Sequence, residues 1–148
     1  MVTLFPCSLV DAPKIKRYLY SKVSLEVVED MILQWNTKEF QGRYFEMFAV
    51  RNEDRLVGCL SLYQHTREVI SLGPEIFPAE RRRGYAKEAM ELGLAKAREM
   101  GFKIVHQQIR VENTASIALH RSLGFETNGA EFTNAKGNRV VFYFLSLT

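Results

Sequence analysis

The sequence predicts an α/β fold in which helices pack on a mixed β-sheet, and it predicts a single domain over residues 1–148. Segments with apolar residues at helical spacing alternate with segments at strand spacing, in the order ααβββαβαββ. A chain of 148 residues is long enough to bury a core without disulfides or metal ions. Its 47% hydrophobic and 25% charged residues exclude collagen, a disulfide scaffold and intrinsic disorder.

Two helices are predicted before the first strand. Asp11 and Pro13 are expected to begin the first one, because an aspartate can accept the free backbone amides and a proline presets φ in the first turn. Ser24 is expected to cap the second helix. Each segment has one apolar face at helical spacing, formed by Ile15, Tyr18 and Leu19 in the first and by Val27, Val28, Met31, Ile32 and Trp35 in the second.

Three strands follow these helices. Residues 44–50 and 56–63 are rich in aromatic and apolar side chains, and the turn chemistry of residues 52–54 between them predicts a β-hairpin. A third strand is predicted over residues 68–77. Because Pro74 cannot donate to a ladder, we expect the end of this strand to be bulged or unpaired on one side.

The second half of the chain predicts two more helices, one strand and a last hairpin. Gly101 and Gly124 are expected to end the two helices, and Asn113 is expected to cap the shorter one. The predicted ranges are a helix over 85–100, a strand over 103–111, a helix over 115–123 and hairpin strands over 126–132 and 139–147.

Charge and apolar patterning limit the partners that we expect. The 20 basic residues exceed the 17 acidic ones by only three, whereas nucleic-acid binders usually show a larger and more clustered excess. No apolar run approaches the roughly 20 residues of a membrane span, and the first residues lack the basic start of a signal peptide. We therefore expect a cytoplasmic protein without nucleic-acid or membrane partners.

The cysteines and histidines do not predict a metal site. Cys7 and Cys59 lack CxxC spacing, and we interpret them as reduced, small hydrophobic residues, although their spacing leaves a bond between them open. His65 and His106 fall in strand patterns without metal-ligand spacing, so we interpret them as structural.

One basic cluster lies between the proline-broken strand and the long helix. It is the segment RRRGYA of residues 81–86. A helix N-terminus leaves four amides unpaired and carries partial positive charge, which suits a pyrophosphate. Gly84 lets the backbone approach an anion, Ala86 lets the helix pack closely, and each arginine could pair with a phosphate. The alternative is a solvated basic turn, because short motifs of this kind also occur by chance.

A second segment, NTASIALHRSLGF of residues 113–125, begins a helix at the end of the strand that should neighbour this turn. Together the two segments resemble the GNAT superfamily of N-acetyltransferases, and the order of elements agrees over most of the chain. The GYAxEA form of the turn is similar to the branch that modifies ribosomal-protein N-termini and small amines. The matching positions are Arg81, Gly84 and Ala86 of the Q/R-x-x-G-x-G/A motif, and Asn113, Ser116, Gly124 and Phe125 of the closing motif.

The resemblance implies a mostly antiparallel sheet flanked by helices, in which one parallel pair of strands splays apart. It implies that acetyl-CoA binds in this splay as the acetyl donor, without a metal ion. The backbone of Ile76 would pair with the pantetheine arm, and Asn113 would bond the pantetheine while it caps its helix. The pyrophosphate would be bound by the turn that begins at Arg81, through the backbone amides of Arg82, Arg83, Gly84, Tyr85, Ala86 and Lys87.

Acetyl transfer by direct attack in a ternary complex needs a neutral amine, a polarised thioester and a proton for the leaving thiolate. Where the family usually has a tyrosine as the acid, this chain has His120, which would either donate the proton or only pack near the sulfur while water donates it. Some relatives carry a glutamate as the base where this chain has Gln108. Glu75 is then the nearest carboxylate, with Glu68 and a chain of waters as alternatives.

The acceptor is expected to be a small-molecule or peptide amine on the opposite side of the splay. Four aromatic residues either line its pocket or close the core: Trp35, Phe40, Tyr44 and Phe45. Exposed strands at the sheet edge are compatible with a homodimer. Two other functions stay open: a non-catalytic acyl-CoA-binding or sensing module on the same fold, and a nucleic-acid binder, against which the mild charge argues.

Overall fold

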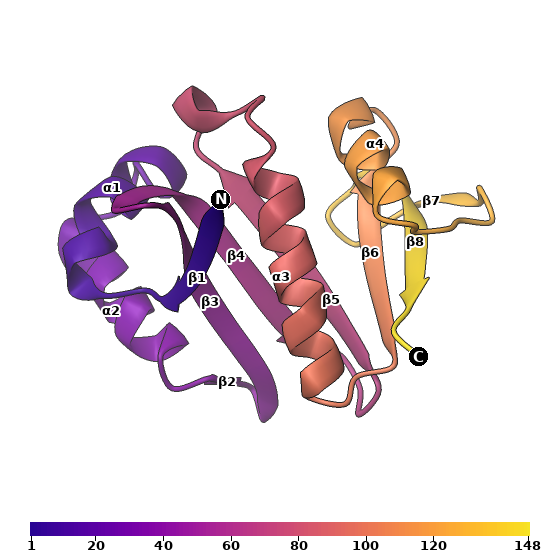
Figure 1. The fold of residues 1–148 in the computed structure, drawn as a ribbon, viewed down its shortest axis with the longest axis horizontal. Helices are drawn as coiled ribbons and strands as arrows, with labels where there is room; N and C mark the ends of the chain where they lie inside the picture. The colour runs from indigo at the N-terminus through magenta and orange to yellow at the C-terminus, as the bar shows by residue number, and fades with distance from the viewer.

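The computed structural model describes residues 1–148 and arranges eight strands in one sheet with four α-helices around it (Figure 1). The strands are β1 (Val2–Pro6), β2 (Glu39–Phe40), β3 (Arg43–Asn52), β4 (Arg55–Gln64), β5 (Val69–Ile76), β6 (Ile104–Arg110), β7 (Glu131–Thr133) and β8 (Arg139–Ser146). The helices are α1 (Ala12–Leu19), α2 (Leu25–Trp35), α3 (Tyr85–Glu99) and α4 (Thr114–Ser122), with short 3₁₀ turns η1 (Leu9–Asp11) and η2 (Pro78–Glu80).

The sheet is antiparallel except at one pair of neighbours. Its order is β1-β3-β4-β5-β6-β8-β7, with β2 paired to β3. The strands β5 and β6 run parallel and share only the pairs Val69–Ile104 and Ile70–Val105. Beyond these they diverge towards the ends that lead into α3 and α4 (Figure 1). The predicted fold, a mostly antiparallel mixed sheet with a splayed parallel pair, is confirmed.

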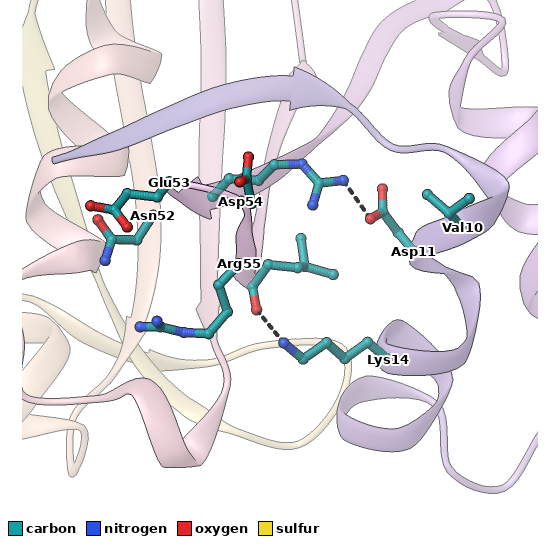
Figure 2. Close-up of a pocket in the computed structure, with 9 residues that line it drawn as sticks. Val10, Asp11, Lys14, Asn52, Glu53, Asp54 and Arg55 are labelled. Carbon is teal, nitrogen blue, oxygen red and sulfur yellow. Dashed lines mark hydrogen bonds and ion pairs between the residues drawn. The ribbon is translucent and has the colours of Figure 1, made fainter.

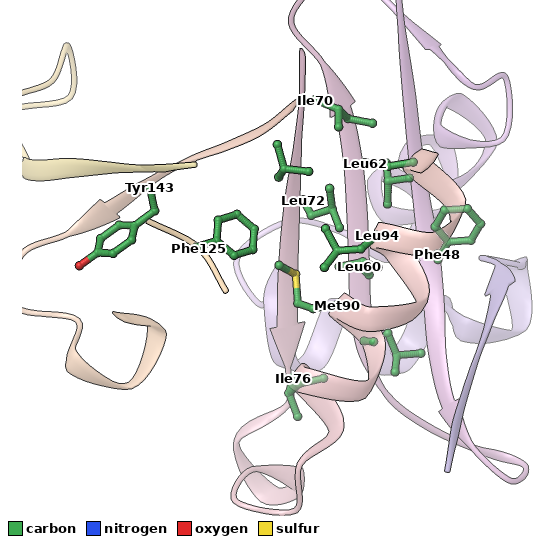
Figure 3. Close-up of a cluster of buried hydrophobic side chains, with 14 of the residues drawn as sticks. Phe48, Leu60, Leu62, Ile70, Leu72, Ile76, Met90, Leu94, Phe125 and Tyr143 are labelled. Atoms are coloured by element: carbon green, nitrogen blue, oxygen red, sulfur yellow. The ribbon is translucent and has the colours of Figure 1, made fainter. Parts of the chain in front are cut away.

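Helices cover both faces of the sheet, because neighbouring residues of a strand point to opposite sides. On one face α3 and α4 pack on a core that includes Phe48, Leu60 and Met90 (Figure 3). On the other face α1 and α2 pack over β3 and β4, around a smaller core that includes Ala12, Ile15, Val28, Ile32, Ala49 and Cys59. Cys7 also lies in this smaller core, and both cysteines are free thiols.

Two short strands are not predicted from the sequence. The first, β1, pairs along its whole length with the last five residues of β3, and Val2 is buried against the larger core. The second, β2, is a two-residue partner of β3. Both are short edge segments that gain their hydrogen bonds from β3, so neither is long enough to give a clear strand signal in the sequence. The first strand of the last hairpin is also shorter than predicted, because only Glu126 of the segment 126–130 forms a bridge, to Phe144.

The predicted helix caps have different outcomes. Ser24 and Asn113 accept from the backbone amides of Val27 and Ser116, at 3.2 and 3.1 Å, as expected. The prediction for Asp11 is wrong, because its carboxylate caps no amide of α1. It accepts instead from the backbone amide of Ser8 at 2.9 Å and pairs with Arg51 on β3, which ties α1 to the sheet. None of the four helices is long and apolar enough to cross a membrane.

Candidate functional site

The turn before α3 has the backbone conformation that the basic motif predicts. Gly84 is the residue before the helix and has a φ of 81°, in the left-handed region, and Arg82 also has a positive φ of 66°. An ideal Cβ on Gly84 would meet nothing within 4 Å, so the space in front of the helix is open. A groove of about 630 Å³ begins here, lined by Pro74, Glu75, Ile76, Glu80, Arg81, Arg82, Gly84, Tyr85, Ala86, Lys87, Asn113, Ala115, Ser116 and Leu119.

The structure brings nearly all of the predicted cofactor-binding residues together in this groove. Arg83 is the one member of the predicted set that does not line it. Its guanidinium lies 3.5 Å from the carboxylate of Glu80, which is also bound through two hydrogen bonds by Arg55. Arg81 donates from Nε to the carbonyl oxygen of Ile76 at 3.1 Å. The three arginines therefore differ: Arg81 and Arg83 have partners within the turn, and Arg82 has none.

Tyr85 contributes to the turn from its buried side. Its ring belongs to the larger core, and its hydroxyl accepts from the Asn52 side chain at 2.9 Å. The same hydroxyl lies 3.4 Å from Arg55, which binds Glu80. The first residue of α3 is thus tied to the β3–β4 hairpin, and this holds the free amides of the helix in place.

The inner edge of β5 faces the splay. The backbone amide of Phe77 donates to the carbonyl oxygen of Val57. Hydrogen-bonded and non-hydrogen-bonded pairs alternate along antiparallel strands, so the next pair, Gly58 and Ile76, has no hydrogen bonds between its members. The backbone groups of Ile76 therefore point away from β4 and towards β6, and the alternation places Pro74 and Leu72 the same way. The predicted loss of pairing at Pro74 is confirmed on the β6 side, while its pairing with β4 is intact.

A polar side chain from β6 reaches across the splay to Leu72. Gln107 accepts from the Leu72 amide at 3.0 Å and donates to the Leu72 carbonyl oxygen. Gln107 is not among the site residues that the sequence predicts. The signal that would have found it is the strand pattern Val105, Gln107, Ile109, which places a glutamine among residues that point to the buried face.

His120 lies at the bottom of the splay with 3% of its surface exposed. Its Nδ1 is 2.7 Å from the Ser116 carbonyl oxygen, its Nε2 is 3.1 Å from Nε2 of Gln107, and its ring packs edge-on against Phe125. Burial lowers the pKa of His120, and the hydrogen bond to Ser116 offsets only part of this effect. The ring is therefore neutral at pH 7.

The two candidate carboxylates lie in different places. Glu75 is exposed and sits opposite Cys59 of β4, on the face that carries α1 and α2. Burial raises the pKa of Tyr20, and the nearby Cys59 and Glu75 add to this effect. Glu68 precedes the other end of β5 and forms an exposed ion pair with Lys103 at 3.8 Å, so the structure does not bring it to the site.

A second pocket, of about 380 Å³, continues from the groove into the splay and shares Pro74 and Ser116 with it. Of the four aromatic residues expected at the acceptor side, Phe45 lines this pocket and Trp35 is buried in the core. The pocket contains no carboxylate and no lysine or arginine. Its lining is Phe45, Ser61, Tyr63, Ser71, Leu72, Gly73, Pro74, Gln107, Gln108, Ile109, Ser116 and His120.

His65 and His106 form part of an aromatic row beside this pocket. Their rings are 4.3 Å apart, and His106 stacks on Phe142 at 5.3 Å. His65 also exchanges a 2.7 Å hydrogen bond with Ser71. Burial lowers the pKa of both histidines. These contacts agree with the structural interpretation of the two residues.

Another hollow, of about 540 Å³, lies at the turn between β3 and β4 (Figure 2). Four of its charged residues already have partners: Arg51 binds Asp11, Lys14 donates to the Leu56 carbonyl oxygen at 2.9 Å, and Arg55 binds Glu80. No predicted site residue lines this hollow. We therefore place the candidate site in the groove and the splay pocket.

A model of the "Acetyltransferase (GNAT) domain" family matches residues 3–126. The chain belongs to the GNAT acetyltransferase family. Comparison with curated protein sequences gives no match. Among solved structures, this GNAT chain is similar to the spermidine/spermine N-acetyltransferase SpeG of Vibrio cholerae, with a TM-score of 0.81, 16% identity, and coverage of 99% of this chain and 95% of the other.

Two further solved structures share the GNAT fold of this chain. One is yncA of Salmonella typhimurium, a putative acetyltransferase, with a TM-score of 0.76, 17% identity and coverage of 99% and 94% of the two chains. The other is RimJ of Mycobacterium smegmatis, with a TM-score of 0.80, 17% identity and coverage of 98% and 81%. At these identities the likeness concerns the fold, so substrates have to be argued from the residues of the site.

Proposed function

We propose that this GNAT protein is an N-acetyltransferase that uses acetyl-CoA as donor and transfers the acetyl group to an amine by direct attack in a ternary complex. Acetyl-CoA supplies an activated acetyl group, so the chain needs no nucleophile of its own. Cys59, a thiol of β4 in the smaller core, fits this view because it is buried and its pKa is raised by its hydrogen bond with Cys7 and by burial.

The proposal rests on the presence of two binding features in one groove, one suited to an anion and the other suited to amide groups. The free amides at the start of α3 meet the open space in front of Gly84, and the backbone of Ile76 faces the same groove. The first suits a pyrophosphate and the second suits an amide-containing arm. Acetyl-CoA contains both groups, and similar structures were solved with acetyl-CoA or a CoA-disulfide.

The acceptor amine would enter through the splay pocket, from the face that carries α1 and α2. Phe45 and Tyr63 offer apolar contact there, and the backbone and side-chain groups of the pocket orient the amine for attack. Similar structures include spermidine N-acetyltransferases. The lining of the present pocket lacks the carboxylates that a polyamine would need, which supports an amine with an uncharged remainder.

The site offers few side chains that could transfer protons. The acceptor has to lose a proton, and Glu75 is the carboxylate on its side of the sheet. Of the two roles that the sequence leaves open for His120, packing near the reacting groups has more support, because its ring is neutral and both of its nitrogens are hydrogen-bonded. Water in the open pocket would then donate the proton to the leaving thiolate.

Calorimetric titration with acetyl-CoA, followed by an assay of thiol release with a panel of amines, tests the proposal. We expect saturable binding of acetyl-CoA and thiol release that depends on the added amine. The non-catalytic alternative predicts the same binding without amine-dependent thiol release, and the absence of glutamate and tyrosine at the usual positions is what favours it. No binding of acetyl-CoA at all would reject both functions.

A further inference from the structure

A buried glutamine replaces part of the sheet between β5 and β6. Gln107 is 6% exposed, and its side-chain amide meets both backbone groups of Leu72. A neighbouring parallel strand would offer the same donor and acceptor. The Gln107 side chain therefore supplies the hydrogen bonds of one residue pair at a point where the backbones of β5 and β6 no longer pair directly.

Only one orientation of the Gln107 side-chain amide is compatible with its hydrogen bonds to Leu72. If the Gln107 amide were flipped, its oxygen would face the Leu72 carbonyl oxygen and its NH₂ group would face the Leu72 amide, so neither contact could be a hydrogen bond. With Nε2 towards the carbonyl oxygen, the second N–H of Gln107 is left for His120, whose Nε2 is 3.1 Å away. Gln107 is therefore the donor to the imidazole.

The tautomer of His120 follows from its other nitrogen. The Ser116 carbonyl oxygen, 2.7 Å from Nδ1, can only accept, so Nδ1 carries the ring proton. Nε2 then has a free electron pair for the N–H of Gln107. No charged side chain lines the pocket around the ring: α4 contributes Ser116, β6 contributes Gln107, Gln108 and Ile109, β5 contributes Ser71, Leu72, Gly73 and Pro74, and Tyr63 of β4 is the other titratable residue. The ring of Phe125 packs edge-on against the imidazole.

We propose that Gln107 is a positioning residue, which sets the separation of β5 and β6 at Leu72 and holds His120 as the neutral Nδ1–H tautomer with an accepting Nε2. The proposal rests on the proposed function only in that the splay is taken as the place of acyl transfer. It implies that His120 cannot release a proton from Nε2 while the hydrogen bond to Gln107 is intact.

Nitrogen NMR of histidine-labelled protein tests the tautomer directly, because protonated and unprotonated ring nitrogens differ in chemical shift. The spectrum of His120→Phe identifies the signals. In the wild type we expect a His120 ring that is protonated on Nδ1 and neutral at pH 7. In Gln107→Glu an acceptor replaces the donor, so we expect Nε2 to take up a proton and the pKa of His120 to rise by about one unit or more.

Gln108→Glu is the matched control, since it adds the same charge one residue along, on the opposite face of β6. We expect this variant to keep the wild-type tautomer. A wild-type ring with its proton on Nε2, or equal His120 titrations in the two glutamate variants, would overturn the proposal. The wild-type measurement decides the tautomer even if Gln107→Glu does not fold.

The second half of the proposal, the separation of the strands, is tested with Gln107→Leu. This variant keeps the volume but leaves the Leu72 amide and carbonyl group without partners. We expect acetyl-CoA to bind about tenfold more weakly, whereas Gln34→Leu on the exposed surface of α2 should bind as the wild type does. Equal affinities would reject this role. None of these measurements needs an acceptor amine, so failure to find acetyl transfer would count against the proposed function alone.

Discussion

The three arginines of the turn before α3 differ in what they can offer a ligand. Arg81 donates to Ile76, and Arg83 lies within ion-pair distance of Glu80. Arg82 has no hydrogen-bond or ion-pair partner in the chain, and its φ of 66° lies in the left-handed region. A guanidinium that already has a partner loses part of that interaction when it binds an anion, so the free one should contribute most to affinity.

Arg82→Ala should therefore weaken acetyl-CoA binding about tenfold, because a hydrogen bond to a charged group is lost. Arg83→Ala should change the affinity by about twofold at most, since exposed ion-pair partners contribute little. Calorimetric titration of both variants at low and at high salt measures the difference. Equal losses in the two variants would contradict the assignment of Arg82.

The histidines make the stability of the protein depend on pH. Burial lowers the pKa of His65, His106 and His120 in the folded state. The unfolded chain therefore binds protons first as the pH falls through the ordinary histidine value of about 6.5, and stability that is present above this pH is lost below it. We expect the urea midpoint to be lower near pH 5.5 than near pH 7.5.

His120→Phe provides the test of which histidine is responsible. It removes one of the three titrating groups and keeps the contact with Phe125. Its urea midpoint should change less between the two pH values than that of the wild type. A wild-type midpoint that rises on acidification would contradict the sign of the shifts.

At the scale of the element, α3 begins and ends in the same backbone conformation. Gly84 precedes the helix with a φ of 81°, and Gly101 follows it with a φ of 90°. An ideal Cβ meets no atom within 4 Å at either position. A β-branched side chain is strained at a positive φ in either position. Substitutions at the two glycines can therefore distinguish the effect of backbone strain from the effect on ligand binding.

Gly84→Val should abolish acetyl-CoA binding, because the side chain strains the turn and enters the groove in front of the free amides. Gly101→Val suffers the same strain at the far end of the helix. We expect both variants to be destabilised by about 1–2 kcal/mol, and only the first to lose affinity. Thermal unfolding and calorimetric titration of both proteins measure this. If Gly84→Val bound acetyl-CoA as tightly as the wild type, the proposal that this turn binds the pyrophosphate would be wrong.

At the scale of the whole molecule, the splay joins a charged groove to an uncharged pocket. Arginines and a lysine line the groove, whereas the splay pocket has neutral polar and aromatic residues. Transfer of a second ammonium group from water into such a pocket has no compensating carboxylate and is therefore unfavourable. The selectivity for acceptors should follow from this difference.

A monoamine with an aromatic or aliphatic remainder should have a kcat/KM about tenfold or more above that of spermidine. Thiol release measured with phenethylamine and with spermidine, each over a range of concentrations, tests this. Hexylamine is a control for chain length without the extra charges. A preference for spermidine would show that a carboxylate outside the pocket, such as Glu75, governs the acceptor.

Much of the fold was predictable because its signals are local. The hairpin of β3 and β4, the amphipathic α2 and the capped α4 each follow from residues that are adjacent in sequence or one turn apart. The strands β1 and β2 carry no such signal, since both depend on β3 for their hydrogen bonds. The role of Asp11 was not predictable for the same reason, because its partner Arg51 is distant in the sequence and lies on β3.

The sequence by itself determined the family of this protein and the conformation of the turn before α3. Gly84, the arginines and the first residues of α3 are consecutive, so the backbone conformation and the free amides follow from local chemistry. Only the tertiary structure decided which arginine is free and what fills the splay. Gln107, Leu72 and His120 belong to three different elements, and they meet because β5 and β6 separate after two residue pairs. Such contacts depend on how strands are placed in space, which no local pattern encodes.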